Sequence, residues 1–305
     1  MGVDLFFVLS GFLITGILVK CKDQSFGRYI GGFYARRARR ILPAYIAIML
    51  IATFAYGSEW AHHWYLYFGA MNFIVPLHIS GLPGPMWSIW SLAVEEQFYL
   101  LWPLAIFYLS PKQTIKCGLF LLALAPVLRF VCTPLFDDHL AIYMLLPFRM
   151  DTLAAGALIA LLWPQVKDKV LNYRPILSGG IVVILGLSLL AIRWLALHGF
   201  TTDSNTRVGN FGVYEATLVI ATSVFLLALM GIGKPILSFA PLRWLGMISY
   251  SVYLFHTTAL NFFPRPAAVL ITLAYSTAMW FLVEKPILNF KVHRADPAGV
   301  TLATK

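Results

Sequence analysis

The chain has 305 residues, of which 60% are hydrophobic and only 12% are charged. A soluble domain usually carries about 45–50% apolar and about 25% charged residues, so this composition excludes an ordinary water-soluble globule. The formal net charge is +10, but the basic residues lie in short loops between apolar runs. That pattern indicates membrane orientation rather than nucleic-acid binding. Three scattered cysteines form no metal-binding or disulfide spacing.

Nine apolar stretches are each long enough to cross a hydrocarbon layer of about 30 Å as an α-helix. Because a bilayer offers no water to unpaired backbone groups, we expect an all-α, polytopic membrane helix bundle. We expect one integral-membrane domain over residues 1–290 and a short cytoplasmic tail over 291–305. The predicted spans are residues 4–20, 41–57, 91–109, 115–133, 146–163, 176–196, 213–231, 244–262 and 266–283.

A tenth apolar stretch, residues 62–80, is placed by the charge of the loops. Residues 20–40 carry seven basic residues against one acid and should be cytoplasmic. If 62–80 is interfacial or re-entrant, the later basic loops also fall inside, and the acidic segment 136–139 falls outside. We therefore predict nine spans, with the N-terminus outside and the C-terminus cytoplasmic.

The first span, VDLFFVLSGFLITG, places Ser10 and Gly11 near its middle. Small residues at these positions allow close helix packing, and Ser10 could equally line a polar site. The next motif, FYARRARRILPAY, contains Arg36, Arg37 and Arg40. Guanidinium groups suit bidentate phosphate binding, although a plain anchor to anionic lipid is the alternative.

The stretch WSIWSLAVEEQFYLLWP places Glu95 and Glu96 in an otherwise aromatic and aliphatic run. A charge near the bilayer centre costs about 2.5–3.5 kcal/mol, so such residues are functional candidates. Glu95 shares its helical face with serines and aromatic residues, whereas Glu96 shares the greasier face. We therefore favour Glu95 as the site residue, with a structural ion pair as the alternative.

Two later spans carry further candidates. LPFRMDTLAAG contains Arg149 and Asp151, which are two residues apart and should contact different partners. ISYSVYLFH contains Tyr250 and brings His256 well into its span, where a histidine can donate, accept and titrate. Each of these residues could instead serve packing or helix anchoring.

Four of these stretches together resemble the acyltransferase 3 family of integral-membrane O-acyltransferases. Two weaker features, FRMDTLAAGALIA and VEKPI, follow in the expected order, and the resemblance covers essentially residues 2–290. The four main stretches are GVDLFFVLSGFLITGIL (2–18), FYARRARRILPAY (33–45), WSLAVEEQFYLLWP (90–103) and ISYSVYLFH (248–256).

The resemblance implies transfer of an acyl group, often acetyl, from cytoplasmic acyl-CoA to a hydroxyl of a cell-surface polysaccharide, lipopolysaccharide or other glycolipid. Acyl-CoA would be a co-substrate, with no bound cofactor and no metal. The family implies a multi-pass protein of the plasma or inner membrane with ten helices, so nine spans here correspond to a member without the first helix. That helix carries the family's catalytic histidine, which has no counterpart in this sequence.

By motif, the resemblance makes Glu95 and His256 candidate catalytic residues and assigns acyl-CoA phosphate binding to Arg36, Arg37 and Arg40. Residues expected to line the acceptor site are Ser10, Arg149, Asp151 and Tyr250. An inactive member of the family and a transporter or flippase for a lipid-linked sugar remain alternatives. The sequence leaves the oligomeric state open, including a homo-oligomer.

Overall fold

The computed structural model describes residues 2–58, 62, 64, 67–79 and 88–289. Every regular element in this part of the chain is helical, which confirms the all-α prediction. The long helices are α1 (Gly2–Lys20), α2 (Phe26–Tyr56), α3 (Trp90–Tyr108), α4 (Pro111–Cys132), α6 (Met150–Asn172), α7 (Arg174–Leu197), α8 (Arg207–Leu229), α10 (Ala240–Phe262) and α11 (Arg265–Met279). The short elements are η2 (Met71–Phe73), η4 (Thr133–Leu135), α5 (His139–Met144), η5 (Leu146–Phe148), α9 (Lys234–Leu237), the π-helical turn η6 (Trp280–Glu284) and α12 (Lys285–Asn289).

Each of the nine predicted stretches is helical. Among the described residues, six helices are long and apolar enough to cross a membrane: α1, α2, α4 with η4, α7, α8, and α11 with η6 and α12. The helices α3, α6 and α10 fall outside that group, and these three carry four of the nine candidate site residues: Glu95, Asp151, Tyr250 and His256. The count of nine spans and the side of the C-terminus stay predictions, and the predicted tail 291–305 lies outside the described residues.

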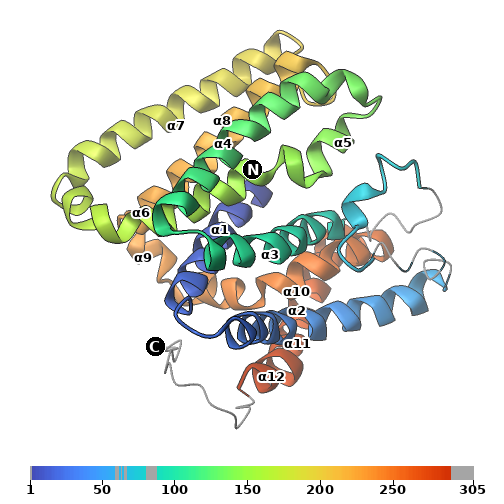
Figure 1. Ribbon diagram of the computed structural model, residues 1–305. Coiled ribbons are helices and arrows are strands. Elements are labelled where there is room, and N and C mark those ends of the chain that lie inside the picture. The colour runs from blue at the N-terminus through green and yellow to red at the C-terminus, as the bar shows by residue number, and fades with distance from the viewer. Residues whose placement is uncertain (1, 59–61, 63, 65–66, 80–87, 290–305) are drawn as a thin grey trace.

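The helices form two groups joined by a central pair (Figure 1). One group contains α4, α6, α7 and α8, and the other contains α2, α10, α11 and α12. Helix α1 packs mainly against α6, and it also contacts α8 and α3. The chain thus places α1 and α3 between the groups, where side chains from both can meet.

Close packing of α1 on α6 depends on two glycines. A Cβ atom at Gly11 would overlap the Leu153 carbonyl, and one at Gly156 would overlap the Val8 carbonyl. Neither backbone could approach so closely with a larger residue, as in small-residue contacts between membrane helices. The packing interpretation of Gly11 is therefore confirmed.

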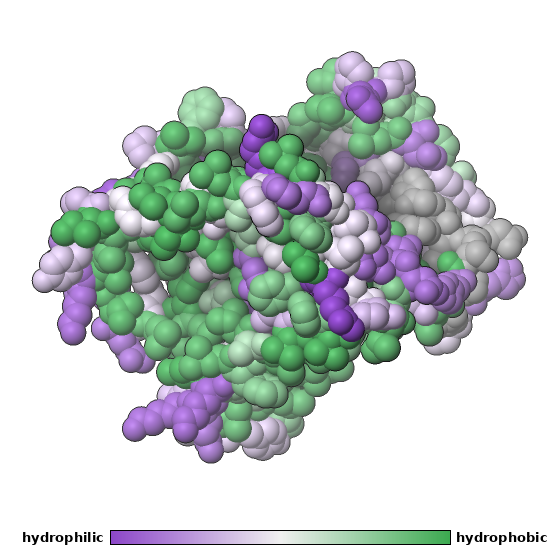
Figure 2. Space-filling view, turned by 90° about the horizontal axis from the view of Figure 1, so that it is seen from above, coloured by the Kyte–Doolittle hydropathy of each residue, from purple (hydrophilic) through white to green (hydrophobic). Residues whose placement is uncertain are grey.

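The outer surface is largely apolar. Many large hydrophobic side chains are exposed along α2, α4, α7 and α11, and the most apolar 18-residue stretch of α7 has no buried residue. Figure 2 shows hydrophobic side chains over much of one face, with hydrophilic ones gathered in smaller groups. Such a surface suits lipid as the solvent. The chain is a membrane protein.

Helix α2 is longer than its predicted span. It begins at Phe26 rather than near residue 41, so the arginine motif lies inside the helix instead of in a loop before it. Arginine and alanine are good helix formers, which explains why the polar stretch continues the helix. In the described part of residues 62–80, the structure has only short turns and η2, with no span-length helix.

Helix α3 is fastened to α1 and α2 by side-chain hydrogen bonds. Trp102 Nε1 donates to Thr15 Oγ1 of α1 at 2.8 Å. From α2, Tyr29 donates to the Pro103 carbonyl at 3.1 Å and Tyr34 to the Tyr99 carbonyl at 3.2 Å. These bonds fix the rotation of α3, and with it the direction in which Glu95 and Glu96 point.

Candidate active site

Glu95 is buried between α1 and α3, with 2% of its surface exposed. Tyr99, one turn further along α3, donates its hydroxyl to Glu95 Oε1 at 3.0 Å. The same hydroxyl meets the hydroxyl of Ser10 from α1. The i, i+4 spacing on α3 and the mid-span serine of α1 thus build a three-residue polar cluster.

Arg37 approaches this cluster from α2. Its guanidinium carbon lies 5.1 Å from the centroid of the Tyr99 ring and 5.9 Å from that of Phe33, within the range of cation–π attraction. It is also close enough to interact electrostatically with Glu95. Among the described residues, Arg37 makes no hydrogen bond or ion pair, so its N–H donors remain open to a ligand.

A cavity of about 350 Å³ lies between α2, α3 and the turn at residues 68–69. Its polar lining includes Arg37, Glu96 and the Tyr99 side chain. The full lining is Tyr34, Arg37, Ala38, Ile41, Leu42, Phe68, Gly69, Glu96, Gln97, Tyr99 and Leu100. Glu95 is not among these residues, so it lies behind the cavity wall and Glu96 faces the cavity.

The wall opposite α2 is held in place by an amide pair. Gln97 Nε2 donates to Asn72 Oδ1 at 2.8 Å and to the Gly69 carbonyl at 2.7 Å, and Asn72 Nδ2 returns a bond of 3.2 Å to Gln97. Gly69 has φ of +79°, a left-handed conformation that favours glycine. Tyr45 adds a 2.6 Å bond to the Tyr67 carbonyl. The cavity is therefore preformed.

Helix α10 supplies Tyr250 and Tyr253. Tyr250 donates to the Ile41 carbonyl of α2 at 3.2 Å and lies within electrostatic range of both Glu95 and Glu96. Tyr253 bonds to Ser91 of α3 at 2.6 Å. Tyr250 of α10 thus lies within electrostatic range of Glu95, which Ser10 of α1 and Arg37 of α2 approach from other sides.

His256 lies one turn beyond this contact and is half-buried. Its Nδ1 is bonded to the Tyr253 carbonyl at 2.7 Å and to the Val252 carbonyl at 3.2 Å, which fixes the ring against its own helix. No described contact joins His256 to Glu95, although Tyr253 and Ser91 link their helices. Its catalytic role stays a prediction.

The three candidate arginines among the four of the motif have different surroundings. Arg37 lines the cavity, Arg36 is exposed near Cys21, and Arg40 lies 6.0 Å from the Trp280 ring of η6. Side chains at 36 and 40 are one turn apart on the same face of α2. The motif therefore offers two arginines on one face and a third turned inward.

Arg149 and Asp151 belong to a second buried cluster at the start of α1. Arg149 pairs with Asp4 of α1, while Asp151 pairs with Arg129 of α4 at 2.6 Å. Arg129 also pairs with Glu215 of α8 and donates to the Phe148 carbonyl at 2.5 Å. The expectation of different partners for Arg149 and Asp151 matches this arrangement.

Aromatic rings enclose the same cluster. The Arg149 guanidinium carbon lies 5.0 Å from the Tyr214 ring centroid and 5.4 Å from that of Tyr143. Neither Arg149 nor Asp151 lines the 350 Å³ cavity. Their predicted role in lining an acceptor site is untested, and the closed pairs favour a structural role.

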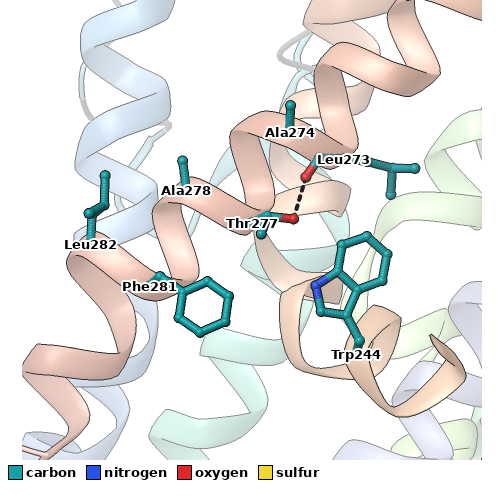
Figure 3. A pocket seen from close by; sticks show the side chains of 7 residues that line it. All are labelled: Trp244, Leu273, Ala274, Thr277, Ala278, Phe281 and Leu282. Carbon is teal, nitrogen blue, oxygen red and sulfur yellow. Dashed lines mark hydrogen bonds between the residues drawn. The ribbon is translucent and has the colours of Figure 1, made fainter. Parts of the chain in front are cut away.

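A larger apolar groove of about 570 Å³ lies between α10, α11 and η6 (Figure 3). Its hydroxyl group, on Thr277, is turned back to the Leu273 carbonyl at 2.6 Å. The other lining residues are Trp244, Leu273, Ala274, Ala278, Phe281 and Leu282. This groove offers no titratable group for chemistry. Among the described residues, no group of three or more His, Cys, Asp or Glu could hold a metal ion.

Sequence reasoning missed four residues of these two clusters. Tyr99 is one of the aromatic residues on the helical face of Glu95, and its i+4 spacing is the signal that could indicate it. Arg129, Glu215 and Asp4 are not among the candidates that the sequence yields. The three missed charged residues pair between helices, so no local pattern could have indicated them.

The fold and the site define a helical membrane protein with a preformed polar cavity between its helices. Comparison with known families identifies it further: the acyltransferase domain family model matches residues 1–284. The chain therefore belongs to the acyltransferase 3 family, as its motifs predicted. No solved structure matches the chain significantly.

Three curated proteins are similar in sequence to this chain. Peptidoglycan O-acetyltransferase OatA of Listeria monocytogenes is 30% identical over 288 residues, which cover 84% of this chain and 44% of that protein. "Putative O-acetyltransferase SACOL0978" of Staphylococcus aureus is 30% identical over 86% of this chain and 46% of its own. "Putative peptidoglycan O-acetyltransferase YrhL" of Bacillus subtilis is 28% identical over 94% and 50%. The chain spans about half the length of these relatives.

Proposed function

We propose that this chain forms the membrane part of an O-acetyltransferase that moves an acetyl group from cytoplasmic acetyl-CoA to a hydroxyl of a cell-surface carbohydrate. The family and the printed names of the relatives support the reaction class. The observation that carries the proposal is Arg37, which makes no hydrogen bond or ion pair to any described residue, beside the Tyr99–Glu95–Ser10 cluster at a preformed cavity.

The reaction needs a group that binds the donor. Arg36 and Arg40 lie on one face of α2, where guanidinium groups could hold the CoA phosphates. Arg37 points inward from the same turn, so a donor bound on that face would bring its thioester toward the cavity. The phosphate-binding role predicted for all three arginines is thereby narrowed to Arg36 and Arg40.

Arg37 is suited to stabilise negative charge. When the acceptor hydroxyl attacks the thioester carbonyl, a C–O bond forms, charge develops on the carbonyl oxygen, and the C–S bond then breaks. The hydroxyl proton ends on the leaving thiolate, so the products are an ester and CoA. A preorganised donor at the developing oxyanion is often the largest single catalytic contribution.

Glu95 acts as a positioning residue. Its carboxylate accepts the Tyr99 hydroxyl, and the Tyr99 ring carries the Arg37 guanidinium on its face. A negative charge behind the ring also attracts Arg37 electrostatically. We propose that Glu95 thereby fixes the rotamer of Arg37, while His256 and Tyr250 act from α10.

The test is acetyl transfer in membranes that contain the natural protein. Radiolabelled acetyl-CoA would be supplied, and label in carbohydrate would be measured beside acetyl-CoA binding. We expect Arg37→Gln to abolish transfer while the protein still folds. A transporter would bind no acetyl-CoA, and an inactive family member would bind it without transfer. Either result would refute the proposed function.

A further inference from the structure

Two charged side chains of opposite sign face the cavity without a partner. Arg37 and Glu96 both line it, and within the described residues neither makes a hydrogen bond or an ion pair. The other polar groups of the lining are occupied. Tyr34 and Gln97 bond to backbone carbonyls, and Tyr99 bonds to Glu95. The hydrogen-bonding groups left available to a ligand are therefore the N–H donors of Arg37 and the carboxylate of Glu96.

Unpaired charges are costly where water is scarce. A membrane protein that keeps two of them in one cavity is suited to a ligand that satisfies both. Arg37 needs an acceptor, such as a carbonyl oxygen that gains negative charge. Glu96 needs a donor, such as a hydroxyl. In the proposed reaction, the thioester supplies the first group and the acceptor molecule supplies the second.

The rim of the cavity has a different character. Leu42, Phe68 and Leu100 line it and are 47%, 77% and 59% exposed. Leu42 and Leu100 lie within predicted membrane spans, where an exposed leucine meets hydrocarbon rather than water. The mouth of the cavity therefore opens sideways, between α2 and α3, and an amphiphile with a polar head and an apolar tail fits both parts.

We propose that this cavity receives a lipid-anchored carbohydrate acceptor from the bilayer. The lipid tail lies against Leu42, Phe68 and Leu100, and the sugar hydroxyl donates a hydrogen bond to Glu96. The hydroxyl then faces the thioester carbonyl held at Arg37. This inference rests on the proposed function and adds the class of acceptor and its route.

A water-soluble polymer does not explain the rim. It would gain nothing from the exposed leucines and phenylalanine at the mouth between α2 and α3. A lipid anchor turns the same rim into a binding surface, because each apolar group that it covers is worth free energy in proportion to the area buried.

Two neighbouring leucines of α3 provide a matched pair for the test. Leu100 and Leu101 are both 59% exposed, but only Leu100 is a lining residue of the cavity. The natural full-length protein in phosphatidylglycerol nanodiscs would be given radiolabelled acetyl-CoA and one of two acceptors. These are N-acetylglucosamine linked to dioleoylglycerol and the soluble methyl glycoside of the same sugar.

We expect transfer to the lipid-linked acceptor to exceed transfer to the soluble one. Leu100→Gln should raise KM for the lipid-linked acceptor about tenfold and should raise KM for the soluble acceptor by less, whereas Leu101→Gln should change neither. Glu96→Gln should lower kcat/KM for both acceptors. Equal use of both acceptors, or equal effects of the two leucine variants, would overturn the lateral route while the proposed function stands.

A second measurement does not depend on turnover. A photoactivatable residue at position 100 should capture the lipid-linked sugar, and excess unlabelled sugar lipid should compete with it. The same residue at position 101 should capture bulk lipid without such competition. If neither acceptor is acetylated, the proposed function fails, and indistinguishable capture at the two positions would overturn the lateral site as well.

Discussion

The protein buries two clusters of charge, and they differ in how the charges are satisfied. At the start of α1, Asp4 pairs with Arg149, and Arg129 is shared between Asp151 and Glu215. About 9 Å further along α1, six residues on, Ser10 meets the cluster of Tyr99 and Glu95. Beside it, Arg37 and Glu96 make no hydrogen bond or ion pair within the part of the chain that the structure describes.

The difference separates framework from site. In the first cluster each carboxylate meets a guanidinium and aromatic rings cover Arg149, although the Nε atoms of Arg129 and Arg149 find no hydrogen-bond partner among the described residues. We call this cluster closed because its opposite charges are paired. It joins α1, α4, α6 and α8, and none of its charged residues lines either of the two pockets described above. The second cluster lies beside a preformed cavity, into which Arg37 and Glu96 present charged groups that have no partner among the described residues. Burial of a charge in a membrane protein therefore marks a candidate, and the presence or absence of an internal partner sorts the candidates.

The largest expected effect is on stability and comes from the closed cluster. Arg149→Met would leave the Asp4 carboxylate buried without its partner, which typically costs about 3–5 kcal/mol. Thermal unfolding of the solubilised protein would measure the loss. The double change Asp4→Asn with Arg149→Met should be more stable than the single one. Wild-type stability of Arg149→Met would contradict the structural role.

The next effect is on activity and comes from the open cluster. Glu95→Gln keeps the shape of the side chain but removes the charge that attracts Arg37. We expect acetyl transfer to fall about 100-fold with little change in unfolding temperature. Acetyl-CoA binding, measured on the same Glu95→Gln protein, should persist and would separate a loss of transfer from a loss of donor binding. Full activity in this variant would remove Glu95 from the site.

A smaller effect should follow from Tyr99→Phe. The ring that carries Arg37 remains, but the hydroxyl bonds to Glu95 and Ser10 are lost. One such hydrogen bond is worth about 0.5–1.5 kcal/mol, so transfer should fall roughly tenfold or less. The rate of transfer at saturating acetyl-CoA would measure it. A loss as large as that of Glu95→Gln would mean that the hydroxyl has a direct chemical role.

The smallest effect should come from Glu215, which is 28% exposed at the edge of the closed cluster. Solvent screens a partly exposed pair, so Glu215→Gln should cost no more than about 1 kcal/mol. Asp151 remains as the buried partner of Arg129. We would measure the unfolding temperatures of Glu215→Gln and Arg149→Met side by side. The loss of stability should be smaller at the edge of the cluster, at Glu215, than at its centre, at Arg149. A similar loss in both would contradict the grading.

The sequence predicted the helices well because long apolar runs have few alternatives in a bilayer. It also singles out Glu95 as a candidate, since a carboxylate in such a run has a local signature, and the role of Glu95 in a site stays a prediction. It missed the early start of α2 at Phe26, because the arginine motif lowers hydropathy without lowering helix propensity. It favoured Glu95 over Glu96 as the site residue, whereas the cavity faces Glu96. The turn at residues 68–69 forms part of the cavity wall and thereby decides which face of α3 meets the cavity. Because this turn precedes α3 by about 20 residues, the local sequence of α3 does not show it.

The most direct test of the account compares one substitution at two arginines, the partly buried Arg37 and the buried Arg149. Arg37→Met and Arg149→Met would be prepared in the same membranes and measured for unfolding temperature and acetyl transfer. The account predicts that Arg37→Met unfolds at or near the wild-type temperature and has lost transfer, whereas Arg149→Met unfolds at a clearly lower temperature. An Arg37→Met protein that transfers acetyl normally, or an Arg149→Met protein as stable as wild type, would contradict it.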